Sequence, residues 1–139
     1  MNIKTSAFWE FSLRFYALPG VAPACLDLQD KGGADVNVVL FLLYLASRGR
    51  RIGRDEVARI DGMVAAWREQ VVRPLRTARR HLKSVTAPFA GEDAANLRNE
   101  IKRNELAAEK IQQHAIEAIL LAVFGASHFG PDKYGSQDQ

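Results

Sequence analysis

Four residues of types that bind cations lie close together in one stretch of the sequence. Asp27, Asp30, Asp35 and Asn37 surround a pair of glycines and precede a strongly apolar run. Asp27 and Asp30 are three residues apart, so on a helix they would share one face. If Asp35 and Asn37 approached them from the start of the next helix, the four side chains would offer the oxygen ligands that divalent cations prefer.

A structural role for the same residues is simpler. Aspartate is among the preferred residues just before a helix, where its carboxylate accepts a hydrogen bond from a free backbone N–H, and Asp35 stands at that position. Asp27 and Asp30 fall on the solvent side of an amphipathic segment. A metal centre would also need more converging carboxylates than this stretch supplies. We therefore favour helix capping and solvated acids over a metal site.

The aromatic residues near the N-terminus suggest a second use of the same corner. They could line a pocket, which predicts a candidate small-molecule, metal-binding or enzymatic site. Its residues would be Trp9, Tyr16, Gln29, Asp30, Asp35 and Asn37. A core role for the aromatic rings is simpler, because the later apolar segments are rich in Val, Leu and Ala. Gln29, Asp30 and Asn37 have no structural role that the sequence identifies.

A run of basic residues is the strongest charge feature. Between residues 48 and 83 there are eleven Arg and Lys but four Asp and Glu, although the net charge of the whole chain is only +3. The densest part has helical spacing, and its residues are Arg73, Arg76, Arg79, Arg80 and Lys83. Arginine forks bind carboxylates and phosphates. We expect these side chains mainly to pair within the chain, with Glu100, Glu105, Glu109 and Glu117 as the partners.

Two external ligands are alternatives for the same basic face. An acidic protein partner would fit it best. Nucleic acid fits it less well, because the basic stripe has no interleaved aromatic residues and the chain has no helix-turn-helix, zinc-finger or RNA-binding signature.

Histidine and cysteine chemistry is not indicated. The histidines, His81, His114 and His128, are scattered and lack metal-ligand spacing, so a tetrahedral zinc site is not expected. Cys25 lies on an apolar stripe and no base can be paired with it, so we expect a small core residue. No glycine-rich phosphate loop or dinucleotide fingerprint occurs. The sequence thus predicts no catalytic residue, no metal and no cofactor.

The elements that must position these residues are helices, because strand signals are nearly absent. Apolar spacing and helix-ending residues predict helices over 6–18, 21–31, 36–48, 54–84 and 93–124. Pro74 lies inside the fourth of these, so that segment is either kinked or broken there. The prediction is an all-α, single-domain bundle of five to six helices (1–125) with a long antiparallel C-terminal helix pair, followed by a disordered tail (126–139).

Composition places the chain among ordinary soluble proteins. It has 139 residues, 47% hydrophobic and 25% charged, with one cysteine. No apolar run reaches the ~20 residues that a membrane span needs, and the N-terminus does not resemble a secretory signal. We therefore expect a cytoplasmic protein.

The first third of the chain resembles a small bacterial family, domain of unknown function 2390. The resemblance rests on the motifs Trp-x-x-Ser-Leu-x-x-Tyr, Pro-Gly-Val, Leu-x-Leu-Gln-Asp and Gly-Ala-Asp-Val-Asn. These are Trp9, Ser12, Leu13, Tyr16, Pro19, Gly20, Val21, Leu26, Leu28, Gln29, Asp30, Gly33, Ala34, Asp35, Val36 and Asn37. Residues 71–83 and 101–112 are similar to the family's second half, whereas Tyr44 stands where many members have tryptophan. The resemblance implies no activity.

These observations favour a non-enzymatic helical protein that acts by binding another protein. The expected surfaces are the Arg-rich face and the apolar segment 116–124, which could also form a homodimer. The small-molecule, metal or enzymatic corner is the first alternative, and nucleic-acid binding is the second.

Overall fold

The computed structural model describes residue 3 and residues 5–124, and every regular element in that part is a helix. The helices are α1 (Ala7–Tyr16), α2 (Val21–Asp30), α3 (Val36–Ser47), α4 (Arg54–Trp67), the π-helical turn η1 (Arg68–Val72), α5 (Arg73–Leu82) and α6 (Glu92–Phe124). The predicted all-α class is confirmed for these residues. The predicted tail, 126–139, lies outside them.

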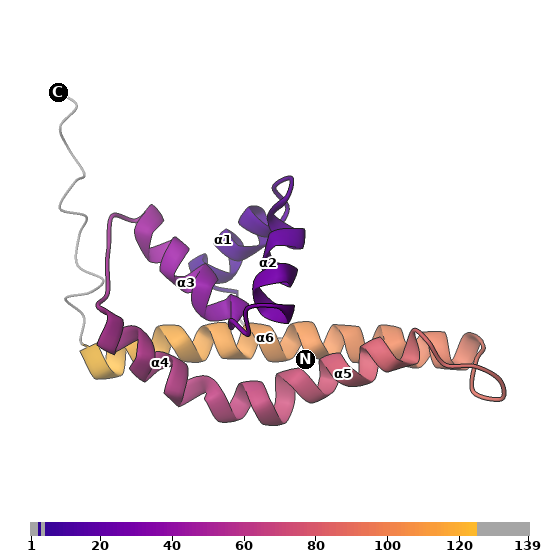
Figure 1. Cartoon of the computed structure of the whole chain (residues 1–139). Helices are drawn as coiled ribbons and strands as arrows, with labels where there is room; N and C mark the ends of the chain where they lie inside the picture. The colour runs from indigo at the N-terminus through magenta and orange to yellow at the C-terminus, as the bar shows by residue number, and fades with distance from the viewer. Residues whose placement is uncertain (1–2, 4, 125–139) are drawn as a thin grey trace.

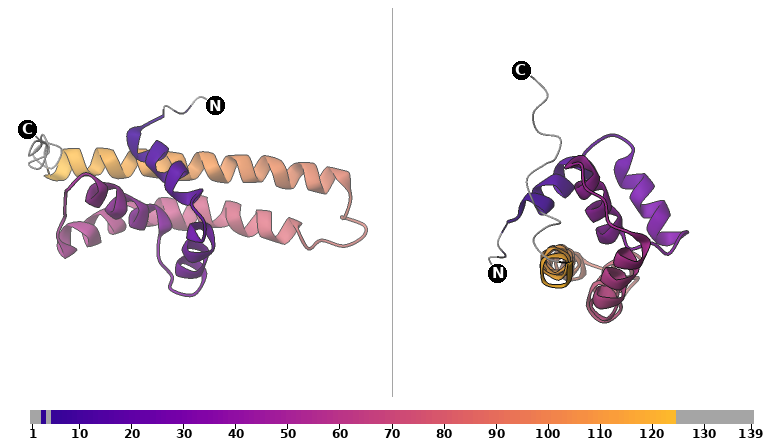
Figure 2. Two further views of the ribbon diagram at one scale, coloured as in Figure 1. Left: turned by 90° about the horizontal axis from the view of Figure 1, so that it is seen from above. Right: turned by 90° about the vertical axis from the view of Figure 1, so that its left-hand side faces the viewer.

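The helices form two groups (Figure 1). The segments α4, η1 and α5 follow one another without a break and lie alongside α6. The shorter helices α1, α2 and α3 pack together on one side of this long pair, and α1 crosses α6 (Figure 2). Because the short helices cover only part of the pair, the outer half of α5 and the start of α6 extend beyond them.

The hydrophobic core lies where α1, α3, α4 and α6 meet. Its fully buried members include Phe8, Phe41, Ile60, Ile116 and Leu120. The rings of Phe8 and Phe41 are 5.1 Å apart between centroids, which is a favourable distance for an aromatic pair. The N-terminal aromatic residues therefore contribute mainly to the core, as their bulk predicted.

Helix ends follow the predicted signals. Ser6 caps α1 by accepting a hydrogen bond from Trp9 N, and Asp35 caps α3 by accepting one from Asn37 N over 3.0 Å. Gly33 has a φ of +65°, a left-handed conformation that glycine adopts without steric cost. The chain thus turns sharply between α2 and α3 and brings Asp35 against the long helices.

The question of a kink or a break at Pro74 is answered by η1. The helix widens to a π-helical turn over Arg68–Val72, and Pro74 follows in the first turn of α5. Proline has no N–H for the bond to the carbonyl four residues earlier, and a wider turn accommodates that loss. The helix is therefore continuous, but its register changes at η1.

The apolar segment at the end of α6 is only partly covered. Ile116 and Leu120 are fully buried, whereas Leu121 is 48% exposed. One face of this segment is therefore buried in the core, and a partner for its exposed face stays a prediction.

Candidate ligand-binding pocket

A chain of polar side chains crosses the interior between the short helices and α6. Ser12 of α1 donates to Gln113 Oε1 over 3.2 Å, and Gln113 Nε2 donates to Asn37 Oδ1 over 3.1 Å. Asn37 Nδ2 donates to Gln112 Oε1 over 3.2 Å, and Gln112 Nε2 donates to Asp35 Oδ2 over 2.7 Å. Ser12, Asn37, Gln112 and Gln113 are all buried. Each amide N–H donates a hydrogen bond to the next residue of the series, so these buried polar groups have partners. The series ends at the carboxylate of Asp35.

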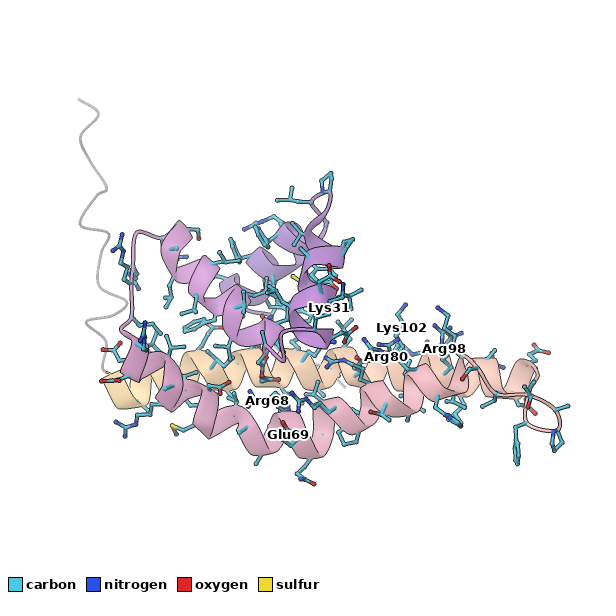
Figure 3. All side chains as sticks on the ribbon, viewed as in Figure 1. Lys31, Arg68, Glu69, Arg80, Arg98 and Lys102 are labelled. Atoms are coloured by element: carbon cyan, nitrogen blue, oxygen red, sulfur yellow. The ribbon has the colours of Figure 1, made fainter. Side chains whose placement is uncertain are left out.

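Arg68 completes this chain from the long helices. Its Nη1 lies 2.8 Å from Asp35 Oδ2 and 2.8 Å from Asp61 Oδ1. The side chain of Asp35 is 6% exposed, so its charge depends on Arg68 and on the bonds from Asn37 N and Gln112 for compensation. Figure 3 shows Arg68 on the continuous segment α4–η1–α5, beneath the connection between α2 and α3.

A second charged cluster joins α5 to α6. Arg76 Nε lies 3.2 Å from Glu105 Oε1, and Arg76 Nη2 lies 3.2 Å from Glu109 Oε1. Arg79 also bonds Glu105 through its Nε, as a very short contact, and through its Nη2 at 3.3 Å. No residue of α5 is fully buried, although Leu75 and Leu82 are partly so, and these pairs therefore add to limited apolar packing in holding α5 against α6.

Burial changes the acidity of three groups beside this cluster. Burial, and after it the charge of Glu105, raises the pKa of Glu109 to about 7. Burial, with smaller contributions from Cys25 and Glu109, raises the pKa of Tyr16, so its hydroxyl stays protonated near neutral pH. Burial also raises the pKa of the Cys25 thiol, which therefore lacks the thiolate character of a nucleophile.

These groups surround a half-open pocket of about 760 Å³ between the short helices and the long pair. Its size is within the ~300–1,000 Å³ range of small-molecule sites. The apolar part of its wall includes Trp9, Leu13, Tyr16, Leu26, Leu40, Val72 and Leu106. The charged part comprises Arg68, Arg73, Arg76, Arg79, Arg80, Lys83, Lys102 and Arg103, against Asp35, Glu105 and Glu109. The wall is therefore both apolar and strongly cationic.

The structure brings together the two sets of residues that the sequence suggested separately. Of the predicted corner, Trp9, Tyr16, Gln29, Asp35 and Asn37 line the pocket. All five predicted basic residues, Arg73, Arg76, Arg79, Arg80 and Lys83, line it too. Asp30 does not line it but pairs with Arg80 at the surface, over 3.3 Å.

The expected internal pairing of the basic run is present for part of it. Arg76 and Arg79 pair with Glu105 and Glu109. Of the other two acids proposed as partners, Glu100 contacts Arg103 of its own helix, and Glu117 has no ion pair within residues 5–124.

Apart from Glu105 and Glu109, six polar residues of the pocket were not predicted from the sequence as site residues: Ser12, Arg68, Lys102, Arg103, Gln112 and Gln113. One signal was available for the two glutamines. They stand side by side just before the apolar segment 116–124, where the last helix enters the core, and amides buried there need polar partners. Ser12 and Arg68 gave no comparable signal, because serine and arginine are unremarkable at those helix positions.

The unpaired cations of the pocket lie at its rim. Within the described part of the chain, Lys83 and Lys102 make no ion pair or hydrogen bond through their side chains. Arg80 and Lys102 lie on the side of the α5–α6 pair that faces α2 (Figure 3). The pair of Arg80 with Asp30 is exposed and so contributes little to stability. The rim therefore carries the positive charges of Lys83, Lys102 and Arg80, and of these only Arg80 has a carboxylate partner within the described residues.

Two further features bear on the kind of site. Among residues 3 and 5–124, no three His, Cys, Asp or Glu side chains converge as metal ligands. Over the same residues, no helix is both long enough and apolar enough to cross a membrane.

Comparison with known proteins gives one match. The model of a family described as "Protein of unknown function (DUF2390)" matches residues 7–116, which include all the buried polar residues named above. No curated protein and no solved structure is significantly similar to the chain.

Proposed function

The chain belongs to the DUF2390 family of proteins of unknown function, and we propose that it is a non-enzymatic binding protein for a small organic anion. One observation carries this proposal. The pocket of about 760 Å³ joins an apolar wall to eight Arg and Lys side chains, opposed by only three Asp and Glu. An anion with an apolar or aromatic body would satisfy both parts of that wall.

The scaffold that we propose for this site is an antiparallel helical hairpin, formed by α4–η1–α5 and by α6. Its inner half packs on the short helices through the core, and its outer half carries the cationic rim. Leu13, Tyr16, Leu26 and Leu106 are 40–52% exposed on the pocket wall. A bound ligand would cover them, and that burial would contribute roughly 25 cal/mol for each Å² of apolar surface.

A set of three small molecules tests the proposal. Anilinonaphthalene sulfonate (ANS) has an aromatic body and a permanent negative charge, phenylnaphthylamine has the same body without the charge, and inorganic sulfate has the charge without the body. A saturating ligand of the native state raises the melting temperature of a domain this size by several degrees. ANS should do so, and the other two should do so less. A melting temperature that none of the three changes would contradict the proposal.

A protein partner with an acidic segment is the second candidate. The observation in its favour is the rim. The side chains of Arg73 and Arg80 are 45% and 44% exposed there, Lys83 is exposed and makes no ion pair within the described residues, and the pocket beside them is open to one side. An acidic peptide would compete with ANS for the same surface. A polyglutamate peptide that displaces ANS at low micromolar concentration would favour this candidate, whereas displacement only at millimolar concentration would favour the small molecule.

A further inference from the structure

Arg76 reaches into the pocket although two carboxylates of α6 hold it. Glu105 has a second arginine partner, because Arg79 bonds it through two nitrogens. Glu109 has no second arginine partner. Within the described residues its only ion pair is with Arg76, whose Nη2 lies 3.2 Å from Glu109 Oε1. Glu109 also lines the pocket. It is therefore the carboxylate that a competing anion can replace with the least disturbance of the helix pair.

The surroundings of Glu109 are short of compensating charge. The charged and titratable groups that face it are Tyr16 of α1, Asp35 at the start of α3, Arg76 and Arg79 of α5, and Glu105 of α6. Cys25 of α2 lies near Tyr16. The nearest charged side chain of η1 in the pocket wall is Arg68, which Asp35 and Asp61 already hold. The two cations that face Glu109, Arg76 and Arg79, are both paired with Glu105 as well, so a second anion beside Arg76 would compete with Glu109 for the same charge.

We propose that the organic anion bound in this pocket takes the place of Glu109 on Arg76, and that Glu109 accepts one proton from solvent as it is released. This inference rests on the proposed anion-binding function and identifies Arg76 as the residue that selects an anionic group. The proton converts the carboxylate of Glu109 to a neutral carboxyl, so the pocket exchanges its own negative charge for that of the ligand. A neutral ligand of the same shape would leave Glu109 ionised and in place.

The acidity of Glu109 suits this exchange. Its pKa of about 7 means that a proton is readily available near neutral pH, even with Arg76 beside it. A ligand anion near the carboxylate raises that pKa further, because two negative charges in a solvent-poor site repel each other. Binding must then be accompanied by proton uptake, and lower pH must favour binding.

Titration calorimetry with ANS as the probe tests this, because the sulfonate stays ionised over the pH range used. The dissociation constant should rise roughly tenfold between about pH 6 and pH 8, since only the protein with a protonated Glu109 is competent. Titrations at about pH 7 in buffers of different ionisation enthalpy should show uptake of up to about half a proton. Neither His81 nor His114 lines the pocket, so Glu109 is the group expected to take it up.

Two variants assign the effect. Glu109→Gln should bind ANS with the same affinity at all three pH values and without proton uptake. Glu10→Gln makes the same chemical change at an exposed position of α1 outside the pocket and should behave as the wild type. The proton count of the wild type decides the matter even if Glu109→Gln does not fold.

Different results would contradict the exchange at Arg76 and the anion-binding function. ANS binding that is independent of pH and takes up no proton would overturn the exchange at Arg76 but leave the anion-binding function intact. An absence of saturable ANS binding at every pH would contradict the anion-binding function itself.

Discussion

Arg68 Nη1 donates a hydrogen bond to Asp35 Oδ2 over 2.8 Å and so connects η1, the π-helical turn between α4 and α5, to the N-cap of α3. Asp35 thereby has two roles at once. It caps a helix through Asn37 N, and it ends the chain of buried amides through Gln112. The short helices and the long pair are thus joined at one carboxylate, beside the pocket.

Removing that carboxylate should destabilise the protein strongly. Asp35→Ala removes the buried carboxylate that accepts from Arg68 Nη1 and Gln112 Nε2, and it also removes the cap of α3. We expect a loss of about 3–5 kcal/mol in the free energy of unfolding. Asp27→Ala is the matched control, because Asp27 is an exposed acid of α2 whose contact with Lys31 is solvated, and it should change stability by less than about 0.5 kcal/mol. Urea unfolding measures both. Equal effects would show that Asp35 is no more than a surface cap.

The amide chain should depend on its central member. Asn37→Ala deprives Gln112 Oε1 of its donor and Gln113 Nε2 of one acceptor in the interior. Each buried group left unpaired costs about 1–3 kcal/mol, so a loss of at least 2 kcal/mol is expected on that scale. Asn99→Ala, at an exposed position of α6, should change stability by less than about 0.5 kcal/mol. A loss below 1 kcal/mol for Asn37→Ala, by the same urea measurement, would contradict a satisfied network at this position.

Glu109 should make stability depend on pH. Its pKa is raised in the folded state from 4.5 to about 7, so between these values the folded protein holds a proton that the unfolded chain has lost. Its contribution to stability is therefore complete below about pH 4.5, falls as the pH rises, and is lost above about pH 7, a change of about 3 kcal/mol. Glu109→Gln should lack this component. The measurement is the difference in unfolding free energy between wild type and variant from about pH 5 to pH 8, and a constant difference would contradict the assignment.

The apolar wall can be tested at Leu106. This side chain is 50% exposed and lines the pocket, so Leu106→Glu should leave the fold intact and weaken ANS binding at least tenfold by placing a negative charge on the wall. Leu97 is 51% exposed on the same helix and does not line the pocket. Leu97→Glu should bind ANS as the wild type does. A similar loss in both variants would mean that ANS does not occupy this pocket.

Much of the fold could be predicted because local rules determined it. The proline and glycines that end the first two helices, the aspartate that caps the third and the periodic apolar residues of the rest predicted five helical segments close to those observed. The π-helical turn could not be predicted, because the periodicity around Pro74 is compatible with a kink, a break or a wider turn. In the structure the wider turn is present, over Arg68–Val72.

The pocket was harder to predict than the fold. The sequence suggested Tyr16 and Asn37 for one site and Arg76 for another, because they are far apart along the chain and nothing local relates them. Their meeting depends on how the short helices pack against the long pair, which is a property of tertiary structure. The exchange of partners around Glu109 depends on distances of a few ångströms, and no periodicity contains that information.

Binding of a small organic anion in the cationic pocket is tested by comparing the ANS affinity of the wild type with that of two charge-reversed variants. The affinity for ANS is measured by titration calorimetry at physiological salt for the wild type and for Lys83→Glu/Lys102→Glu, which reverses the two unpaired cations of the rim. The control is Arg51→Glu/Arg54→Glu, which changes the net charge equally at exposed positions outside the pocket. We expect one binding site per chain. The affinity for ANS should be weakened at least tenfold in Lys83→Glu/Lys102→Glu and by less than about twofold in Arg51→Glu/Arg54→Glu. Equal affinities in all three proteins, or no saturable binding to a wild type with a native circular dichroism spectrum, would contradict anion binding in this pocket.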